Sequence, residues 1–495
     1  MSGLKKLISL ASAAVIALSV CTVNVSASEA YNPYNYDRWG DPISSQAGYT
    51  ADEFVDGVTI GCGSFNEPAD LFVSYDNLMY IVDKGNNRIV ITDLDFNFIR
   101  EMKDFTYNGQ ATELKKPTGI FVDQYTGLIY IADNENERVI KCDEDGNIDR
   151  IFGKPDTELY PPELTYNPNK VIVDKAGNVY VVVKSVTKGA VMFNSEGEFL
   201  GFYGANRVEQ TSEVLANAFW NLISTEDQRA RSKKSTPIGF TNFDIDDKGF
   251  IYTVTESTET TTDLVKKLNP RGNNILDSLG VDNDFQFGDI SPTYYSIYAK
   301  KSTLTDIDIG PNGELNILDF QHGRIFQYDK DAWLLFIMGG TGEQLGTFRS
   351  ATAIESYDNK LFVLDSRKNS ITIFTRTAFG EIVTEAANLY NDGKYEESLE
   401  PWQNVLKYDG NYRRAYIGIG NALFNRFEYE EAMKYFKVSI SRGRYNRAFE
   451  GYRDKWLKAN ISTIMVVIVL IVIAAITLRI LIKKGKLKFL GKGGA

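Results

Sequence analysis

The chain has 495 residues, of which 43% are hydrophobic and 13% aromatic, and its formal net charge is −11. This length suits two or three domains, and the aromatic and glycine content favours many short strands and turns over disorder. The single histidine, His322, excludes a multi-histidine zinc site, and three cysteines exclude a zinc ribbon or a disulfide scaffold.

Residues 1–27 have the features of a secretory signal peptide. Lys5 and Lys6 precede an apolar stretch that ends in small residues before Ala27. We therefore expect cleavage after Ala27, with an uncleaved N-terminal anchor as the alternative. Residues 28–54 are then expected to form an N-terminal extension.

A repeated block of strands and turns fills residues 65–380. Each block has an apolar run, a turn rich in Gly, Asp and Asn, and two alternating strands around a polar corner. Equivalent corners fall near positions 83, 133, 183, 254, 319 and 365. Strand-rich units of about 40–50 residues indicate propeller blades. We predict a mainly β fold, a six-bladed β-propeller over residues 55–379, with a ring-closing strand within residues 55–65.

The best-defined corners read D-K-G-N-N-R-I at 83–89 and D-N-E-N-E-R-V at 133–139, and they resemble the NHL repeat. The Asp and Arg of each corner are expected to bridge adjacent strands, and the Asn residues to tolerate left-handed turns. The resemblance is strong in the first two blocks and weaker in the other four. The fifth block keeps Asp319 and Arg324, whereas the third and fourth have lost the corner.

Two insertions interrupt the period, at residues 206–235 and 277–302. Both are expected on one rim of the propeller. They could shape the mouth of a binding site, or they could be loops that a rigid scaffold tolerates.

From Gly380 the hydrophobic period changes to that of a helix. The segment from Tyr395 to Leu399 recurs as Tyr429 to Met433, and this spacing resembles that of the tetratricopeptide repeat. We predict tetratricopeptide-like helices over residues 380–459, including a capping helix at 446–459. They would offer a concave peptide-binding groove or serve as a rigid stalk.

A second apolar run, from Ile461 to Leu478, contains no charged residue and predicts a transmembrane helix over residues 460–482. The tail at 483–495 is rich in lysine and has no acid, so the positive-inside rule places it in the cytoplasm. The predicted product is a single-pass protein of the cell membrane whose N-terminal domains lie outside the cytoplasm. Its acidic exported part argues against nucleic-acid binding. Cys62 and Cys142 could pair there, although two buried thiols are the preferred interpretation.

The NHL resemblance implies a place for a site. Similar six-bladed propellers include calcium-dependent lactonases and a zinc-dependent amidating lyase, whose chemistry lies in the axial funnel. The matching inner-strand positions are Asp70, Gly119, Lys170, Asn242, Asp306 and Ala351.

From this set we predict a ligand-binding group of Asp70, Lys170, Asn242 and Asp306. Asp70, Asn242 and Asp306 carry oxygen ligands of the kind that calcium prefers, but Lys170 could neutralise the acids without a metal. Asp244 and Asp308 should lie on the same side of their strands. The lyase chemistry is excluded by the histidine count, no catalytic residue is assigned, and His322 is interpreted as a corner residue at the surface.

The sequence therefore favours a membrane-anchored binding or scaffold protein that is not an enzyme and has no resident cofactor. Its expected partners are a protein at the membrane or cell surface, such as a transporter, and a carbohydrate or other small ligand in the funnel. A calcium-dependent, lactonase-like hydrolase and a cell-surface glycan-binding module are the alternatives. The layout is similar to that of uncharacterised surface proteins of Gram-positive bacteria.

Overall fold

The computed structural model describes residues 30–205, 239–256, 264–276, 287–289 and 302–484. They belong to two compact units, a β-propeller and a set of helices, which are described separately. The predicted signal peptide, most of the two insertions and the end of the basic tail lie outside the described residues.

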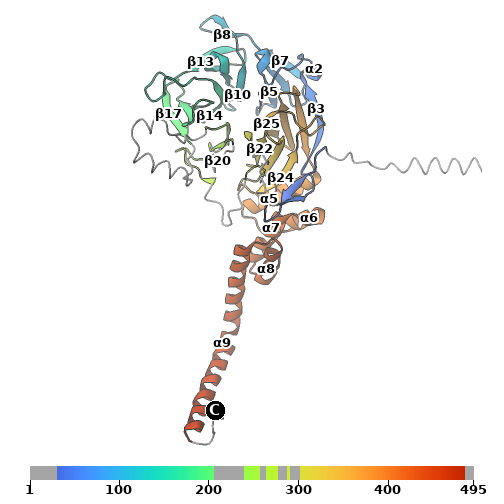
Figure 1. Ribbon diagram of the computed structural model, residues 1–495, viewed down its shortest axis with the longest axis vertical. Helices are drawn as coiled ribbons and strands as arrows, with labels where there is room; N and C mark the ends of the chain where they lie inside the picture. Colours follow the sequence, from blue (N-terminus) through green and yellow to red (C-terminus); the bar gives the residue numbers. More distant parts are fainter. Residues whose placement is uncertain (1–29, 206–238, 257–263, 277–286, 290–301, 485–495) are drawn as a thin grey trace, which may run out of the picture. The chain divides into compact units, whose positions relative to one another are not determined.

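Six sheets form the blades of the propeller (Figure 1). The strands of the first three blades are β4 (Asp70–Val73), β5 (Leu78–Asp83), β6 (Arg88–Asp93), β7 (Phe98–Met102); β10 (Pro117–Val122), β11 (Ile129–Asp133), β12 (Arg138–Cys142), β13 (Asn147–Gly153); and β14 (Pro168–Val173), β15 (Val179–Val183), β16 (Gly189–Phe193), β17 (Phe199–Gly204). The described strands of the last three are β18 (Asn242–Ile245), β19 (Ile251–Val254), β20 (Val265–Leu268); β21 (Leu304–Ile309), β22 (Leu315–Asp319), β23 (Arg324–Tyr328), β24 (Leu334–Gly339); and β25 (Ala351–Tyr357), β26 (Lys360–Asp365), β27 (Ser370–Arg376). Short strands β8 (Phe105–Tyr107) and β9 (Gln110–Thr112) extend the second blade, and β1 (Tyr34–Tyr36) pairs with β24, while β2 spans Pro42–Ser44.

The innermost strands β4, β10, β14, β18, β21 and β25 follow one another around the ring, and β25 returns to β4. The ring is closed by β3 (Tyr49–Asp56), which pairs with β27 from Tyr49–Arg376 to Asp56–Ser370. The predicted closing strand at 55–65 is therefore placed too late in the chain. Residues Gly57–Ile60 form the short helix α2, which begins where the Asp56 carboxylate accepts a hydrogen bond from the Thr59 amide at 2.8 Å.

The second and third strands of the blades carry the apolar core. Their β-branched residues alternate between two faces, and both faces are covered because each blade packs between its neighbours. Aromatic rings bridge adjacent blades, as in the edge-on contact of Phe72 and Phe121, whose centroids are 5.4 Å apart. The result is a rigid ring whose inner strands hold their side chains in fixed positions.

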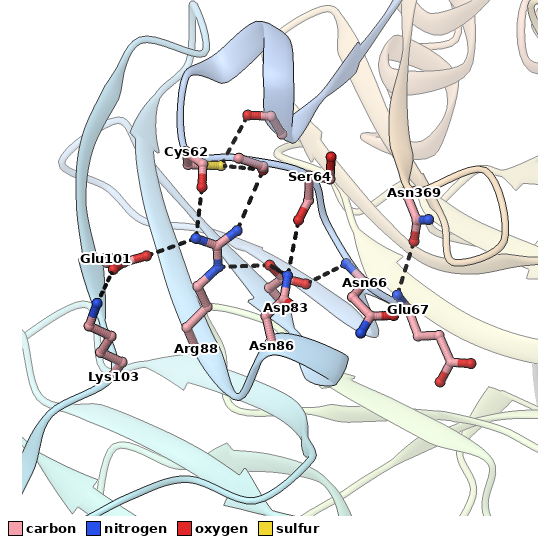
Figure 2. A network of polar contacts seen from close by, with 12 residues as sticks. Cys62, Ser64, Asn66, Glu67, Asp83, Asn86, Arg88, Glu101, Lys103 and Asn369 are labelled. Atoms are coloured by element: carbon pink, nitrogen blue, oxygen red, sulfur yellow. Dashed lines mark hydrogen bonds and ion pairs between the residues drawn. The ribbon is translucent and has the colours of Figure 1, made fainter.

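Figure 2 shows the corner of the first blade. The buried carboxylate of Asp83 accepts hydrogen bonds from Arg88 Nε and Asn86 Nδ2, both at 2.8 Å, and from the Asn66 amide at 2.8 Å. Arg88 also donates to the Cys62 carbonyl at 2.7 Å and to Glu101 at 2.8 Å. The corner therefore joins three segments through charge-assisted hydrogen bonds.

The second blade repeats this arrangement. Asp133 accepts from Asn136 Nδ2 and Arg138 Nε, both at 2.8 Å. The turn residues Asn87 and Glu137 adopt left-handed φ angles of 55° and 50°. The predicted Asp–Arg bridge is confirmed in both blades.

The fifth corner uses the single histidine in place of the asparagine. His322 Nδ1 lies 2.7 Å from Asp319 Oδ2. His322 follows Asp319 by three residues, just as Asn86 follows Asp83 in the first blade. Arg324 pairs instead with Asp289. The hydrogen bond to Asp319 raises the pKa of His322, against the opposing effect of burial. His322 is thus a half-buried corner residue with a structural partner.

The helical unit comprises α5 (Ala378–Asn391), α6 (Leu399–Tyr408), α7 (Arg413–Asn425), α8 (Tyr429–Val438) and α9 (Arg442–Lys483). Each helix packs against the next. Trp402 is fully buried, and a Cβ at Gly418 would lie 2.3 Å from its ring nitrogen, so α6 and α7 approach closely only with glycine at that position. In the same unit, Ser45 donates a 2.7 Å hydrogen bond to Asp409.

The ends of α5 and α7 share one backbone geometry. Gly393 and Phe427 both adopt left-handed φ angles, of 77° and 61°. The next backbone amide donates to a carbonyl five residues earlier in both places, Lys394 to Leu389 and Glu428 to Leu423. The two helical hairpins are therefore equivalent in structure at their turns.

Helix α9 is continuous from Arg442 to Lys483, so it joins the predicted capping helix and the predicted transmembrane helix into one element. It contains an 18-residue window of mean hydropathy 3.1, none of which is buried. By length and composition it can cross a membrane.

Candidate axial binding site

Six equivalent positions of the inner strands form the first ring of the axial channel. Each pairs with the residue just before its corner, as Asp70 does with Val82 and Asp306 with Leu318. In the sixth blade this position is Ala353, which pairs with Leu364 and follows a bulge, as the equivalent residues of the second, third and fifth blades do. Ala351 was predicted at this position from the sequence, so the predicted alignment of the inner strands is wrong by two residues in the sixth blade and correct in the other five.

Lys170 and Asp70 form a buried ion pair, with Nζ and Oδ1 2.6 Å apart and side-chain exposures of 9% and 3%. They come from the third and first blades. Gly119 of the intervening blade allows the strand of Lys170 to approach closely. A Cβ at position 119 would lie 2.9 Å from the Lys170 Cα and 2.6 Å from the Asn169 carbonyl oxygen.

The opposite side of the ring holds a second pair. Asn242 Nδ2 donates to Asp306 Oδ1 at 2.5 Å. The sequence-predicted residues therefore meet as two separate pairs, Asp70–Lys170 and Asn242–Asp306.

Three channel carboxylates also hold the backbone of the following blade. Asp70 accepts from the Ile120 amide at 2.9 Å, Asp244 from the Ile309 amide at 2.9 Å, and Asp306 from the Ile354 amide at 2.8 Å. Hydrogen bonds from backbone amides to a buried carboxylate are strong, so these acids act as blade-to-blade ties.

Two residues further along the inner strands, and on the same side of each strand, lies a second ring of axial positions. It contains Asp244, Asp308 and Glu355. Asp308 accepts from Asn316 Nδ2 at 2.7 Å, and Asn316 in turn accepts from Gln327 at 2.7 Å. Gln327 donates to the hydroxyl of Tyr49 on the ring-closing strand at 3.1 Å. Glu355 was missed by the sequence interpretation, because the residue after it is Ser356, whereas the equivalent residue in the other inner strands is apolar.

Burial and mutual repulsion make these acids hard to ionise. Burial raises the pKa of Asp306 to about 8, against the attraction of Lys170. Burial, then the charge of Asp308, raises the pKa of Asp244 to about 7. The pKa of Glu355 also lies well above its usual range through burial and the nearby acids. Burial disfavours the charge of Lys170, yet Asp70, Asp306 and Glu355 outweigh it and raise the pKa of the ammonium.

The predicted calcium ligands can be compared with this geometry. Among the residues that the structure describes, no group of three or more His, Cys, Asp or Glu side chains is arranged to hold a metal ion. The Lys170 ammonium already supplies the positive charge beside Asp70. The donor set fits a fixed internal cation, and binding of calcium by Asp70, Asn242 and Asp306 stays a prediction.

Comparison with known proteins adds no family. No protein-family model matches the chain, and neither does any curated protein. Among solved structures, virginiamycin B lyase from Staphylococcus aureus is similar at 12% identity over 63% of this chain and 95% of that chain, with a TM-score of 0.37. Kuenenia stuttgartiensis hydrazine synthase is similar at 10% identity over 64% and 97%, with a TM-score of 0.38. A protein of unknown function from Bacteroides thetaiotaomicron is similar at 13% identity over 70% and 76%, with a TM-score of 0.39.

Proposed function

We propose that this protein is a membrane-tethered binding protein that displays a β-propeller outside the cytoplasm and docks a protein partner through its helices. The observation that carries the proposal is the pairing of the axial polar residues. Asp70 and Asp306, the residues best suited to hold a catalytic metal, each tie a neighbouring blade and contact another axial side chain. A ring built in this way is a rigid recognition scaffold.

The tether is supported by the surface of α9. From 461 to 482 this helix has 22 residues, about 33 Å at the helical rise, which matches a hydrocarbon core of about 30 Å. Its apolar side chains are exposed, for example Leu470 at 58% and Ile471 at 61%. Trp456 is exposed just before this stretch, where interfacial tryptophans usually lie.

The docking role is supported by the helical hairpins. Their turns recur at the interval that separates Gly393 from Phe427, and their packing around Trp402 and Gly418 resembles that of tetratricopeptide units, which bind peptides on a concave face. Two such units are few, so a partner protein at the membrane would stabilise the stack.

A lactone hydrolase is the second candidate, and one observation favours it. A pKa of about 7 makes Asp244 suited to general acid–base catalysis. Turnover of simple lactones by the full-length protein, abolished by Asp244→Asn, would support this alternative over the binding role.

Membrane topology is the first experiment. In a Cys62→Ser background, Glu196→Cys places a thiol on the exposed surface of the propeller, and Lys484→Cys places one at the end of α9. With a membrane-impermeant maleimide, we expect labelling of the first variant in intact cells and of the second only after lysis. The reverse pattern would refute the tethered orientation.

Partner docking is the second experiment. A photo-crosslinking residue at exposed Tyr408 of α6 should yield one discrete adduct with a membrane protein of the native host, and the same residue at exposed Leu159 of the propeller should not. Equal adducts from both positions, or none from Tyr408, would contradict helical docking.

A further inference from the structure

Tyrosines lie along one side of one mouth of the axial channel. The inner strand of each blade ends in a turn next to the second ring, and these turns carry Tyr75 in the first blade, Tyr125 in the second and Tyr357 in the sixth. Their side chains are exposed by 60%, 67% and 36%. We name these three residues the tyrosine mouth. Three neighbouring blades thus present aromatic groups at one opening.

Tyr75 extends across this opening. Its hydroxyl donates a 2.5 Å hydrogen bond to Asp247 in the turn of the fourth blade, which is opposite the first in a ring of six. The Tyr75 amide donates to Gln124 at 2.7 Å. The bond to Asp247 is the main cause that raises the pKa of Tyr75 to about 12, and Asp244 adds to it. The Tyr75 hydroxyl therefore lies above the acids of the second ring.

The channel beneath the tyrosine mouth has an excess of carboxyl groups. Lys170 is the one ammonium among the axial residues described above, and it is paired with Asp70. Glu355 lies close to Asp308, Asp244, Lys170 and Asp306, and its side chain is only partly buried. A partly exposed carboxylate that lies among other acids is a position to which a ligand N–H group can donate.

The acids are too dispersed for one metal ion to be held by three of them in the described part of the chain. A longer cation can reach several of them in turn. The Tyr125 ring already has a cation at its face, since Lys175 Nζ lies 5.1 Å from the ring centroid. Aromatic faces at the entrance and carboxylates below are the chemistry that recognises an organic ammonium ion.

We propose that the axial channel binds a protonated organic amine, whose ammonium group lies at Glu355 and whose carbon chain lies against Tyr75 and Tyr125. This deepens the proposed binding function by naming the class of ligand. Entry requires Tyr75 to swing aside, which breaks its hydrogen bond to Asp247.

The test uses the full-length protein in detergent micelles and 1,5-diaminopentane as the probe. Titration calorimetry should show saturable binding of the diamine and none of the neutral 1,5-pentanediol. Glu355→Gln keeps the shape of the side chain and should weaken binding at least tenfold, whereas Glu196→Gln on the exposed surface should leave it unchanged. Tyr75→Phe keeps the ring but loses the bond to Asp247, so it should speed association.

Several results would overturn the proposal. They are equal binding of the diol, diamine binding that Glu355→Gln does not weaken, or no saturable binding of the diamine at millimolar concentration. A calcium heat that Glu355→Gln abolishes would point to a metal site instead. None of these results bears on the topology and crosslinking experiments, so the amine site can fail while the tethered binding role stands.

Discussion

Replacing Lys170 by methionine tests whether the axial ion pair stabilises the propeller. The variant keeps an unbranched side chain, one atom shorter than lysine, and removes the ammonium that lies 2.6 Å from Asp70. Two unit charges at this distance attract by about 6 kcal/mol at an effective dielectric constant of about 20. Returning the lysine to water offsets part of this, and removing one partner of a buried pair costs about 3–5 kcal/mol.

The loss of stability cannot exceed the free energy needed to protonate Asp70, because a protonated carboxyl no longer needs the ammonium. From an ordinary pKa of 3.8, neutralising the carboxyl costs about 4.4 kcal/mol at pH 7 and about 1.6 kcal/mol at pH 5. Loss of the ammonium raises the pKa of Asp70 in the folded variant. A protein with such a carboxyl becomes less stable as the pH rises above the pKa that the group has in the unfolded state. The deficit should therefore be about 3–4 kcal/mol at pH 7 and below about 2 kcal/mol at pH 5.

Urea unfolding of the full-length protein in detergent, followed by the β-sheet signal in circular dichroism, measures this deficit. The double variant Asp70→Asn/Lys170→Met is the control, and its deficit should change much less with pH. A deficit for Lys170→Met below about 1 kcal/mol at pH 7, or one that is equal at both pH values, would refute the reasoning.

Three further predictions concern the turns and the close contacts. Gly119→Ala should destabilise the propeller by about 1–3 kcal/mol in urea unfolding, because its Cβ meets backbone atoms, whereas Gly153→Ala, with open space around it, should change stability by less than about 0.5 kcal/mol. His322→Asn keeps a hydrogen-bond donor for the Asp319 carboxylate. Because the pKa of His322 is raised in the folded protein, the stability that its charge contributes is present below pH 6.5 and is lost as the pH rises through the folded-state pKa. The melting temperatures of wild type and variant should therefore converge or cross between pH 6 and 8, and parallel curves would contradict the pairing. Phe427→Gly should stabilise the helical unit by about 0.5–1 kcal/mol in thermal unfolding, because the exposed phenylalanine is in a left-handed conformation, and Gly393→Ala should act in the opposite direction.

The sequence predicted the six-bladed fold because corner and turn chemistry repeat at a readable spacing. It located Asp70, Lys170, Asn242 and Asp306 near the axis for the same reason, since each precedes the apolar run of an inner strand. It could not predict which of them pair. That depends on Gly119, whose missing side chain lets two residues 100 positions apart meet.

Other features were hidden by local irregularity. The closing strand, Tyr49–Asp56, lies at the outer edge of its blade and exposes Glu53 and Phe54, so its pattern does not look like a buried strand. In the sixth blade, Ser356 replaces the apolar residue by which the other inner strands were aligned, and Glu355 was therefore not recognised. The contact between Tyr75 and Asp247 joins turns of opposite blades, and no local pattern in the sequence reports such a distance.

The central claim is that the axial carboxylates tie the blades together and surround an internal ammonium in place of a metal. Elemental analysis of the full-length protein after equilibration with calcium and gel filtration tests it most directly. The account predicts far less than one calcium ion per chain and unchanged thermal stability on addition of a chelator. One tightly bound calcium per chain, lost in Asp306→Asn together with lactone turnover, would contradict it.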